Sequence, residues 1–154
     1  MNKSQTSLSL AQATDAETIA RMSRDCIEYG LDWTWRAPRV LRNIRDASTN
    51  VIVSREQRGL AGFAVMRYGD EEAHLLLLAV HPARRRCGVG SGLVGWLEAS
   101  ARTAGIGVIR LQARCGNQAA RRFYRSLGYR ELARVNGLYD GVEDGVRIAK
   151  DLWI

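Results

Sequence analysis

Long apolar segments are missing from this chain of 154 residues. No apolar run approaches the roughly 20 residues that a membrane-spanning helix needs. The first ten residues, MNKSQTSLSL, also lack the apolar block of a signal peptide. We therefore expect a cytoplasmic protein without a membrane partner.

Cysteines are few, and their spacing matches neither a metal site nor a disulfide framework. Cys26, Cys87 and Cys115 are odd in number and form no Cys-x-x-Cys or Cys/His motif. Disulfide frameworks need paired cysteines, and zinc sites need clustered ligands. We expect three reduced thiols and no metal cofactor.

Acidic residues are in the minority, with 16 against 23 basic residues and a formal net charge of +7. Such a charge suits nucleic acid, an acidic protein or a polyanionic cofactor. Signatures of helix-turn-helix, RNA-binding strand and zinc-finger proteins are absent. The densest basic cluster, Arg84 to Arg86, lies beside a glycine-rich turn. This position favours a cofactor phosphate over nucleic acid.

That turn follows an apolar strand and precedes an amphipathic helix, in the sequence LLLLAVHPARRRCGVGSG from Leu75 to Gly92. Gly88 and Gly90 allow the backbone to pass close to a ligand. The first amides of the helix have no intrahelical partner and lie at the positive end of its dipole. The segment therefore predicts a pyrophosphate-binding site.

The length, 46% hydrophobic content and 25% charged content are typical of one globular domain over residues 1–154. Hydrophobic periodicity predicts seven strands, over residues 7–13, 51–54, 60–68, 73–80, 108–113, 129–135 and 146–153. It also predicts four helices, after Thr14, after the loop with Trp33 and Trp35, between Gly90 and Gly105, and between Asn117 and Gly128. The order β-α-α-β-β-β-α-β-α-β-β indicates a mixed α/β sheet.

Two motifs in this order identify a family resemblance. The chain lacks P-loop and dinucleotide fingerprints, but Arg85 to Gly90 reads Arg-x-x-Gly-x-Gly. This segment resembles the acetyl-CoA signature of the GNAT superfamily of N-acetyltransferases. A second match, Asn-x-x-Ala-x-x-Phe-Tyr-x-x-x-Gly-aromatic, runs from Asn117 to Tyr129. The resemblance implies the GNAT fold, a mixed and mostly antiparallel sheet of six to seven strands with four helices.

The resemblance also implies acetyl-CoA as co-substrate and assigns its binding residues. Main-chain groups of one strand would bind the pantetheine amides, and an amide near Leu78 would stabilise the oxyanion. The glycine turn would enclose the pyrophosphate. The implied cofactor-binding residues are Leu78, Ala79, Val80, Arg85, Arg86, Cys87, Gly88, Val89, Gly90, Ser91, Asn117 and Tyr124.

Catalytic residues follow from the same resemblance. Tyr124 stands where the superfamily places a general acid, and a phenol with a pKa near 10 can protonate a departing thiolate. Tyr139, Glu143 and Asp144 resemble a late tyrosine and acidic pair of the bacterial ribosomal-protein alanine N-acetyltransferase group, to which the chain is most similar within the superfamily. That group has a glutamate base where this chain has Gln112. His74 is the alternative base that we favour, with Glu71 and Glu72 as further candidates.

The expected acceptor is an amine bound between the loop of Trp33 and Trp35 and the late hairpin that carries Tyr139. Similarity to the ribosomal-protein group favours a protein N-terminal α-amine. The alternatives are a small amine such as a polyamine, amino acid or aminocyclitol, and a non-catalytic acetyl-CoA-binding module. The sequence leaves the choice between monomer and homodimer open.

Overall fold

The computed structural model describes residues 7–153, so residues 1–6 and Ile154 of the expected domain lie outside the described residues. The strands are β1 (Ser7–Leu10), β2 (Thr49–Glu56), β3 (Gly59–Tyr68), β4 (Glu72–Val80), β5 (Val108–Arg114), β6 (Arg130–Tyr139) and β7 (Glu143–Asp151). The helices are α1 (Ala16–Cys26), α2 (Ala37–Ile44), α3 (Val89–Thr103) and α4 (Gln118–Ser126), with short 3-10 turns at Ala13–Asp15 and Pro82–Arg84. No helix in this range is long and apolar enough to cross a membrane.

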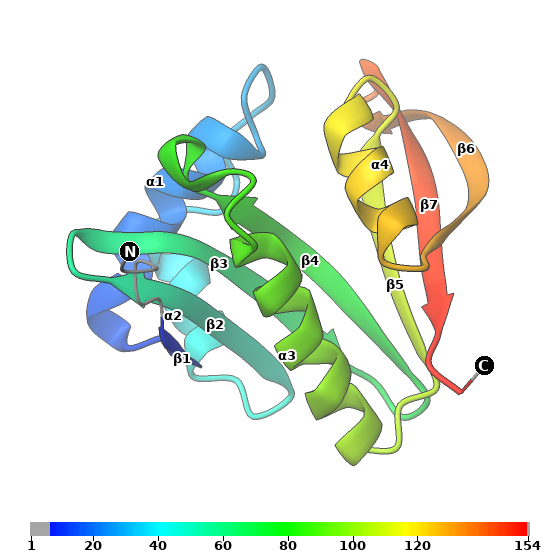
Figure 1. Ribbon diagram of the computed structural model, residues 1–154. Coiled ribbons are helices and arrows are strands. Elements are labelled where there is room, and N and C mark those ends of the chain that lie inside the picture. The colour runs from blue at the N-terminus through cyan, green and yellow to red at the C-terminus, as the bar shows by residue number, and fades with distance from the viewer. Residues whose placement is uncertain (1–6, 154) are drawn as a thin grey trace.

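All seven strands form one sheet in the order β1-β2-β3-β4-β5-β7-β6 (Figure 1). Neighbouring strands are antiparallel except β4 and β5, which run parallel. The predicted element order and the mixed, mostly antiparallel sheet are thereby confirmed.

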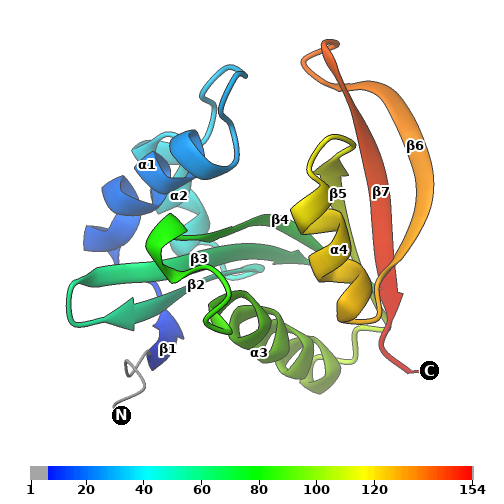
Figure 2. The ribbon, with the colours of Figure 1, turned by 45° about the horizontal axis from the view of Figure 1, so that its top comes forward.

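Helices cover both faces of the sheet (Figure 2). On one face, α1 and α2 pack on β2, β3 and β4 through side chains such as Ile19, Val40 and Phe63. On the other face, α3 and α4 pack through Leu93 and Tyr124, among others. The alternation of apolar residues along β3 and β4 supplies both cores.

Some predicted boundaries were wrong at the start of the chain. β1 ends at Leu10, three residues before the predicted end. Thr14 does not cap a helix but lies inside the first 3-10 turn. The Asp15 carboxylate instead accepts a hydrogen bond from the Gln12 amide at 2.8 Å and one from Arg55 at 2.7 Å. With Asp15 held by these two hydrogen bonds, the turn begins at Ala13, one residue before Thr14.

The parallel strands β4 and β5 separate halfway along their length. They pair only from Glu72 with Val108 to Leu75 with Leu111. Beyond that point β4 stays with β3 and β5 stays with β7, so a wedge opens between them. A bulge at Leu76 marks the start of this separation. The candidate site lies in this wedge.

Candidate functional site

The edge of β4 that faces the wedge carries unpaired main-chain groups. The His81 amide donates to the Ala61 carbonyl at 2.8 Å and so points towards β3. Because amide direction alternates along a strand, the amides of Leu78 and Val80 point away from β3, into the wedge. A polyamide ligand could extend the sheet here in the manner of an added strand. The expected role of Leu78 to Val80 is compatible with this geometry.

The glycine turn brings helix α3 to the end of that edge. Arg86 and Gly88 both have left-handed backbone conformations, with φ of 64° and 81°. A Cβ at Gly90 would lie 3.1 Å from the Phe123 ring, so glycine is what permits the first turn of α3 to touch α4. The residues of that first turn, whose amides have no intrahelical partner, line a hollow together with residues of α4.

The three arginines of the turn differ in their partners. Arg84 forms an ion pair with Glu56 at 2.8 Å, which holds it on the β2–β3 hairpin. Arg85 and Arg86 have no carboxylate partner among residues 7–153, and both line the adjoining hollow. Their charges are therefore available for a bound anion.

This cofactor hollow has a volume of about 840 Å³. It brings together every predicted cofactor-binding residue except Cys87, which is exposed and does not line it. The residues that line it are Asp25, Cys26, Tyr29, Leu78, Ala79, Val80, Pro82, Arg84, Arg85, Arg86, Gly88, Val89, Gly90, Ser91, Asn117, Ala119, Ala120, Arg122, Phe123 and Tyr124. Sequence reasoning missed Arg122, whose charge adds to this set.

Helix α4 positions Asn117 and Tyr124. The Asn117 carboxamide accepts a hydrogen bond from the Ala120 amide at 3.0 Å and caps the helix, as predicted. Tyr124 is buried against Phe123 and Tyr129, with edge-on ring contacts at 5.1 and 5.6 Å. Burial raises the pKa of the Tyr124 phenol well above its ordinary value, and Tyr139 adds to this shift. The phenol therefore keeps its proton at neutral pH.

Two further hollows continue from the cofactor hollow across the wedge. A narrow junction of about 100 Å³ is lined by Leu78, Gln112, Arg114 and Tyr124, among others. It leads to an acceptor cavity of about 610 Å³ on the α1 and α2 face of the sheet. The acceptor cavity is lined by Ile27, Glu28, Leu31, Asp32, Thr34, Trp35, His74, Leu75, Leu76, Leu77, Arg110, Leu111, Gln112, Tyr139, Asp140, Arg147 and Ile148. Tyr124 borders the junction and the cofactor hollow.

The structure does not bring His74 and Tyr124 together. His74 lines the acceptor cavity but not the junction, and its side chain is 52% exposed. It lies four residues before Leu78 on β4, a separation of about 13 Å along an extended strand. Gln112 lines both the acceptor cavity and the junction, between the two residues. A water chain past Gln112 would be needed to connect His74 with the junction.

The predicted aromatic residues of the acceptor site separate into two groups. Trp35 and Tyr139 line the acceptor cavity, whereas Trp33 does not. The Trp33 indole instead donates to the Ala20 carbonyl at 3.1 Å and packs beneath Arg36 and Arg24. Trp33 therefore stabilises the α1–α2 loop without lining the acceptor cavity.

Glu28 organises the same loop, and sequence reasoning missed it. Its buried carboxylate accepts hydrogen bonds from the Ser23 hydroxyl at 2.8 Å, from the Thr34 amide and hydroxyl at 2.7 and 2.8 Å, and from the Trp35 amide at 3.2 Å. These bonds hold the cavity wall in one shape.

Arg114 joins the two walls of the wedge. Its guanidinium donates to the Ile27 carbonyl at 2.7 Å and lies 3.3 Å from the Glu143 carboxylate. The ring centroids of Tyr29 and Tyr139 lie 4.2 and 5.8 Å from the Cζ atom of Arg114. Arg114 thus links the end of α1 with the β6–β7 hairpin.

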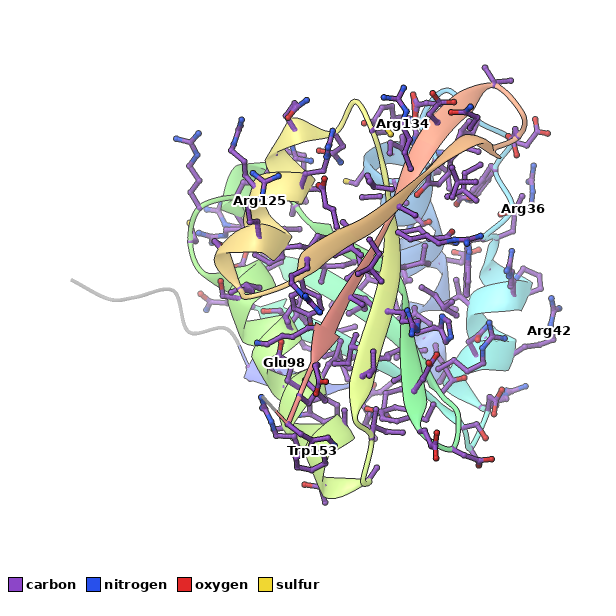
Figure 3. The ribbon with its side chains drawn as sticks, turned by 90° about the vertical axis from the view of Figure 1, so that its right-hand side faces the viewer. Arg36, Arg42, Glu98, Arg125, Arg134 and Trp153 are labelled. Carbon is purple, nitrogen blue, oxygen red and sulfur yellow. The ribbon has the colours of Figure 1, made fainter. Side chains whose placement is uncertain are left out.

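Two acidic residues of the hairpin, Asp140 and Asp144, accept hydrogen bonds from other residues of the protein. Asp144 accepts a hydrogen bond from Arg134 at 2.7 Å; Arg134 is labelled in Figure 3. Asp140 accepts one from the Asp32 amide at 3.2 Å, which forms a second link between the hairpin and the α1–α2 loop. The β6–β7 hairpin is therefore a fixed wall of the acceptor cavity.

Comparisons with known proteins agree with this geometry. The family model described as "Acetyltransferase (GNAT) family" matches residues 15–129. The ribosomal protein bS18-alanine N-acetyltransferase of Escherichia coli K12 is 33% identical over 93 residues, which are 58% of this chain and 63% of that enzyme. The aligned part therefore spans less than two thirds of this relative.

Two solved structures show the same fold over nearly the whole chain. The ribosomal-protein-S18-alanine N-acetyltransferase from Escherichia coli has a TM-score of 0.83 and 24% identity, covering 96% of this chain and 94% of the other. The putative acetyltransferase yncA from Salmonella typhimurium, solved with its cofactor acetyl-CoA, has a TM-score of 0.80 and 22% identity, covering 97% and 95%.

Proposed function

The chain belongs to the GNAT family of acetyltransferases, and from this premise we propose that it transfers the acetyl group of acetyl-CoA to the α-amine of a protein N-terminus. The observation that carries the proposal is the continuous path through the wedge. The cofactor hollow and the acceptor cavity meet at a junction bordered by Leu78 and Tyr124. A thioester and an amine that enter from opposite ends would meet there.

The residues at the junction suit direct transfer. The amine nitrogen attacks the thioester carbonyl carbon, and the Leu78 amide stabilises the resulting oxyanion. The carbon–sulfur bond then breaks, and the Tyr124 phenol donates its proton to the departing thiolate. Burial keeps Tyr124 protonated until that step. The proton lost by the amine passes through water, held by Gln112, to His74.

Two exposed side chains beside the wedge are free to contact a protein acceptor. Tyr29, which lines the cofactor hollow and the junction, is 50% exposed, and Val142, in the turn of the β6–β7 hairpin, is 82% exposed. The ribosomal-protein N-acetyltransferase relative supports the same class of acceptor.

A small amine is the second candidate. The acceptor cavity, at about 610 Å³, lies within the usual range of small-molecule pockets. In addition, Gln112 replaces the base that the ribosomal-protein group uses. A polyamine, an amino acid or an aminocyclitol would each suit a cavity of this size.

Measuring thiol release from acetyl-CoA with pooled N-terminal peptides and with pooled small amines tests the proposal. We expect turnover with peptides. Tyr124→Phe should lower kcat about 10²-fold or more without weakening acetyl-CoA binding, because only proton donation is lost. His74→Ala should lower kcat at neutral pH, and the loss should shrink as the pH rises, because the amine then loses its proton without a general base.

Turnover with small amines alone would replace the proposed acceptor with the second candidate. Acetyl-CoA binding without turnover on either pool would identify a binding module instead. Tyr68→Phe is a matched control, because its hydroxyl bonds Ser100 at 3.0 Å and Tyr68 lines none of the three hollows.

A further inference from the structure

Basic side chains form a row on the floor of the acceptor cavity. His74 on β4 lies directly opposite Arg110 on β5. Two residues further along β5, on the same face, Gln112 lies opposite Arg147 on β7. All four side chains line the cavity. The two arginines bring positive charge together on this face of the sheet, which favours binding of an anion.

Only part of this positive charge is neutralised by the protein. Glu72 accepts a hydrogen bond from Arg110 at 2.9 Å and lies 4.0 Å from His74. The Arg147 side chain, in contrast, forms no ion pair or hydrogen bond with any residue in the range 7–153.

The carboxylates elsewhere in the cavity do not compensate Arg147. Glu28 is occupied by donors from its own loop, and Asp140 accepts from the Asp32 amide. The Asp32 carboxylate also lines the cavity, but it forms no ion pair with Arg147. The cavity therefore contains a guanidinium without an internal counterion. Arginine binds carboxylates through a planar pair of donors, which makes a carboxylate its natural ligand.

We propose that Arg147 binds a carboxylate of the acceptor and thereby selects acceptors with an acidic group close to the reacting amine. This inference rests on the proposed function. Arg147 lies across from Gln112, which also borders the junction, so the bound carboxylate would lie near the reacting amine. In a peptide this group is the side chain of the second residue. In a free amino acid it is the α-carboxylate.

The test compares acceptors that differ only in charge. One set consists of peptides beginning Ala-Glu, Ala-Gln and Ala-Lys, otherwise identical, and the other consists of alanine and alaninamide. For the wild-type protein we expect kcat/KM to be at least about tenfold higher for the acidic member of the set that is used, because a charge-assisted hydrogen bond is lost in the neutral member. The difference should be mainly in KM.

Variants at Arg147 distinguish recognition from a structural role. Arg147→Gln should remove the preference for Ala-Glu over Ala-Gln, and Arg147→Glu should favour Ala-Lys. A variant that only damages the cavity would lower kcat/KM for all three peptides by the same factor. Arg42→Gln is the matched control, since Arg42 is an exposed arginine of α2 that does not line the cavity (Figure 3). Its preference should equal that of the wild type.

Four results would overturn the inference or its basis in different ways. Equal use of Ala-Glu and Ala-Gln by the wild type, or a preference that persists in Arg147→Gln, refutes the role of Arg147. Use of alanine over alaninamide without use of any peptide refutes the protein acceptor but supports Arg147. No turnover with either set refutes both proposals.

Discussion

At the scale of single residues, the position of the wedge depends on a close contact at Gly62. A Cβ at this position would lie 2.7 Å from the Ala79 carbonyl oxygen and 3.0 Å from Val89. Ala79 belongs to the strand that borders the cofactor hollow, and Val89 begins α3. Both neighbours would have to move to admit a methyl group.

Gly62→Ala should therefore lower the free energy of unfolding by about 1–3 kcal/mol, the usual effect of overpacking. It should also weaken acetyl-CoA binding. Gly95→Ala is the matched control, because a Cβ there meets nothing within 4 Å in the exposed middle of α3. That change should stabilise the protein by about 0.5–1 kcal/mol through helix propensity. Chemical denaturation measures the free energy of unfolding of both variants. Equal stability of Gly62→Ala and Gly95→Ala would contradict the packing argument.

Sequence reasoning predicted the local structure correctly where a local motif existed. Asn117 caps α4 as predicted, and the predicted glycine turn does begin α3. Tyr124, as predicted from the motif, borders both the junction and the cofactor hollow. These positions are determined by neighbours a few residues away, so a linear pattern is sufficient to find them.

The residues that sequence reasoning missed depend on distant contacts. Arg114 bonds Ile27, which is 87 positions away in the chain. Arg147 lines the acceptor cavity only because β7 inserts between β5 and β6 in the sheet. Nothing in the local sequence around either arginine distinguishes it from other basic residues. The same limit explains why Trp33 was expected to line the acceptor cavity but does not. Its indole bonds the Ala20 carbonyl, which is 13 positions away in the chain.

At the scale of elements, the α1–α2 loop and the β6–β7 hairpin act as two walls held together by Arg114. Burial raises the pKa of the Tyr139 phenol to about 12, against the opposing effect of the Arg114 charge. Tyr139 is therefore a neutral hydrogen-bonding group at any physiological pH. Its place in the acceptor cavity depends on the arginine that it flanks.

Arg114→Gln should loosen both walls and lower kcat/KM for the acceptor by about tenfold or more, because hydrogen bonds of a buried charged group are lost. The KM for acetyl-CoA should change little. Arg134→Gln is the control on the same hairpin, since its ion pair with Asp144 is exposed and such pairs contribute little. Steady-state kinetics with each substrate varied in turn provides the measurement. An equal loss of acetyl-CoA affinity in Arg114→Gln would refute its positioning role.

At the scale of the whole molecule, the net charge of +7 and the unpaired arginines of the glycine turn should make stability depend on a polyanionic ligand. A ligand present at 100 times its Kd stabilises a protein by about 2.7 kcal/mol. For a chain of this size, that stabilisation corresponds to a rise in Tm of roughly 5–10 °C. Acetyl-CoA should produce this rise, and added salt should reduce it because salt screens exposed charges.

The double variant Arg85→Gln, Arg86→Gln should bind acetyl-CoA about tenfold more weakly, which roughly halves the stabilisation at the same ligand concentration. Arg84→Gln should lose much less, because Glu56 already neutralises Arg84. Pantetheine lacks the pyrophosphate and should therefore raise the Tm of the wild type and of the double variant equally. Thermal denaturation of each protein with acetyl-CoA and with pantetheine measures these changes in Tm. If pantetheine also distinguishes the two proteins, the arginines act on the fold of the turn and not on the phosphates.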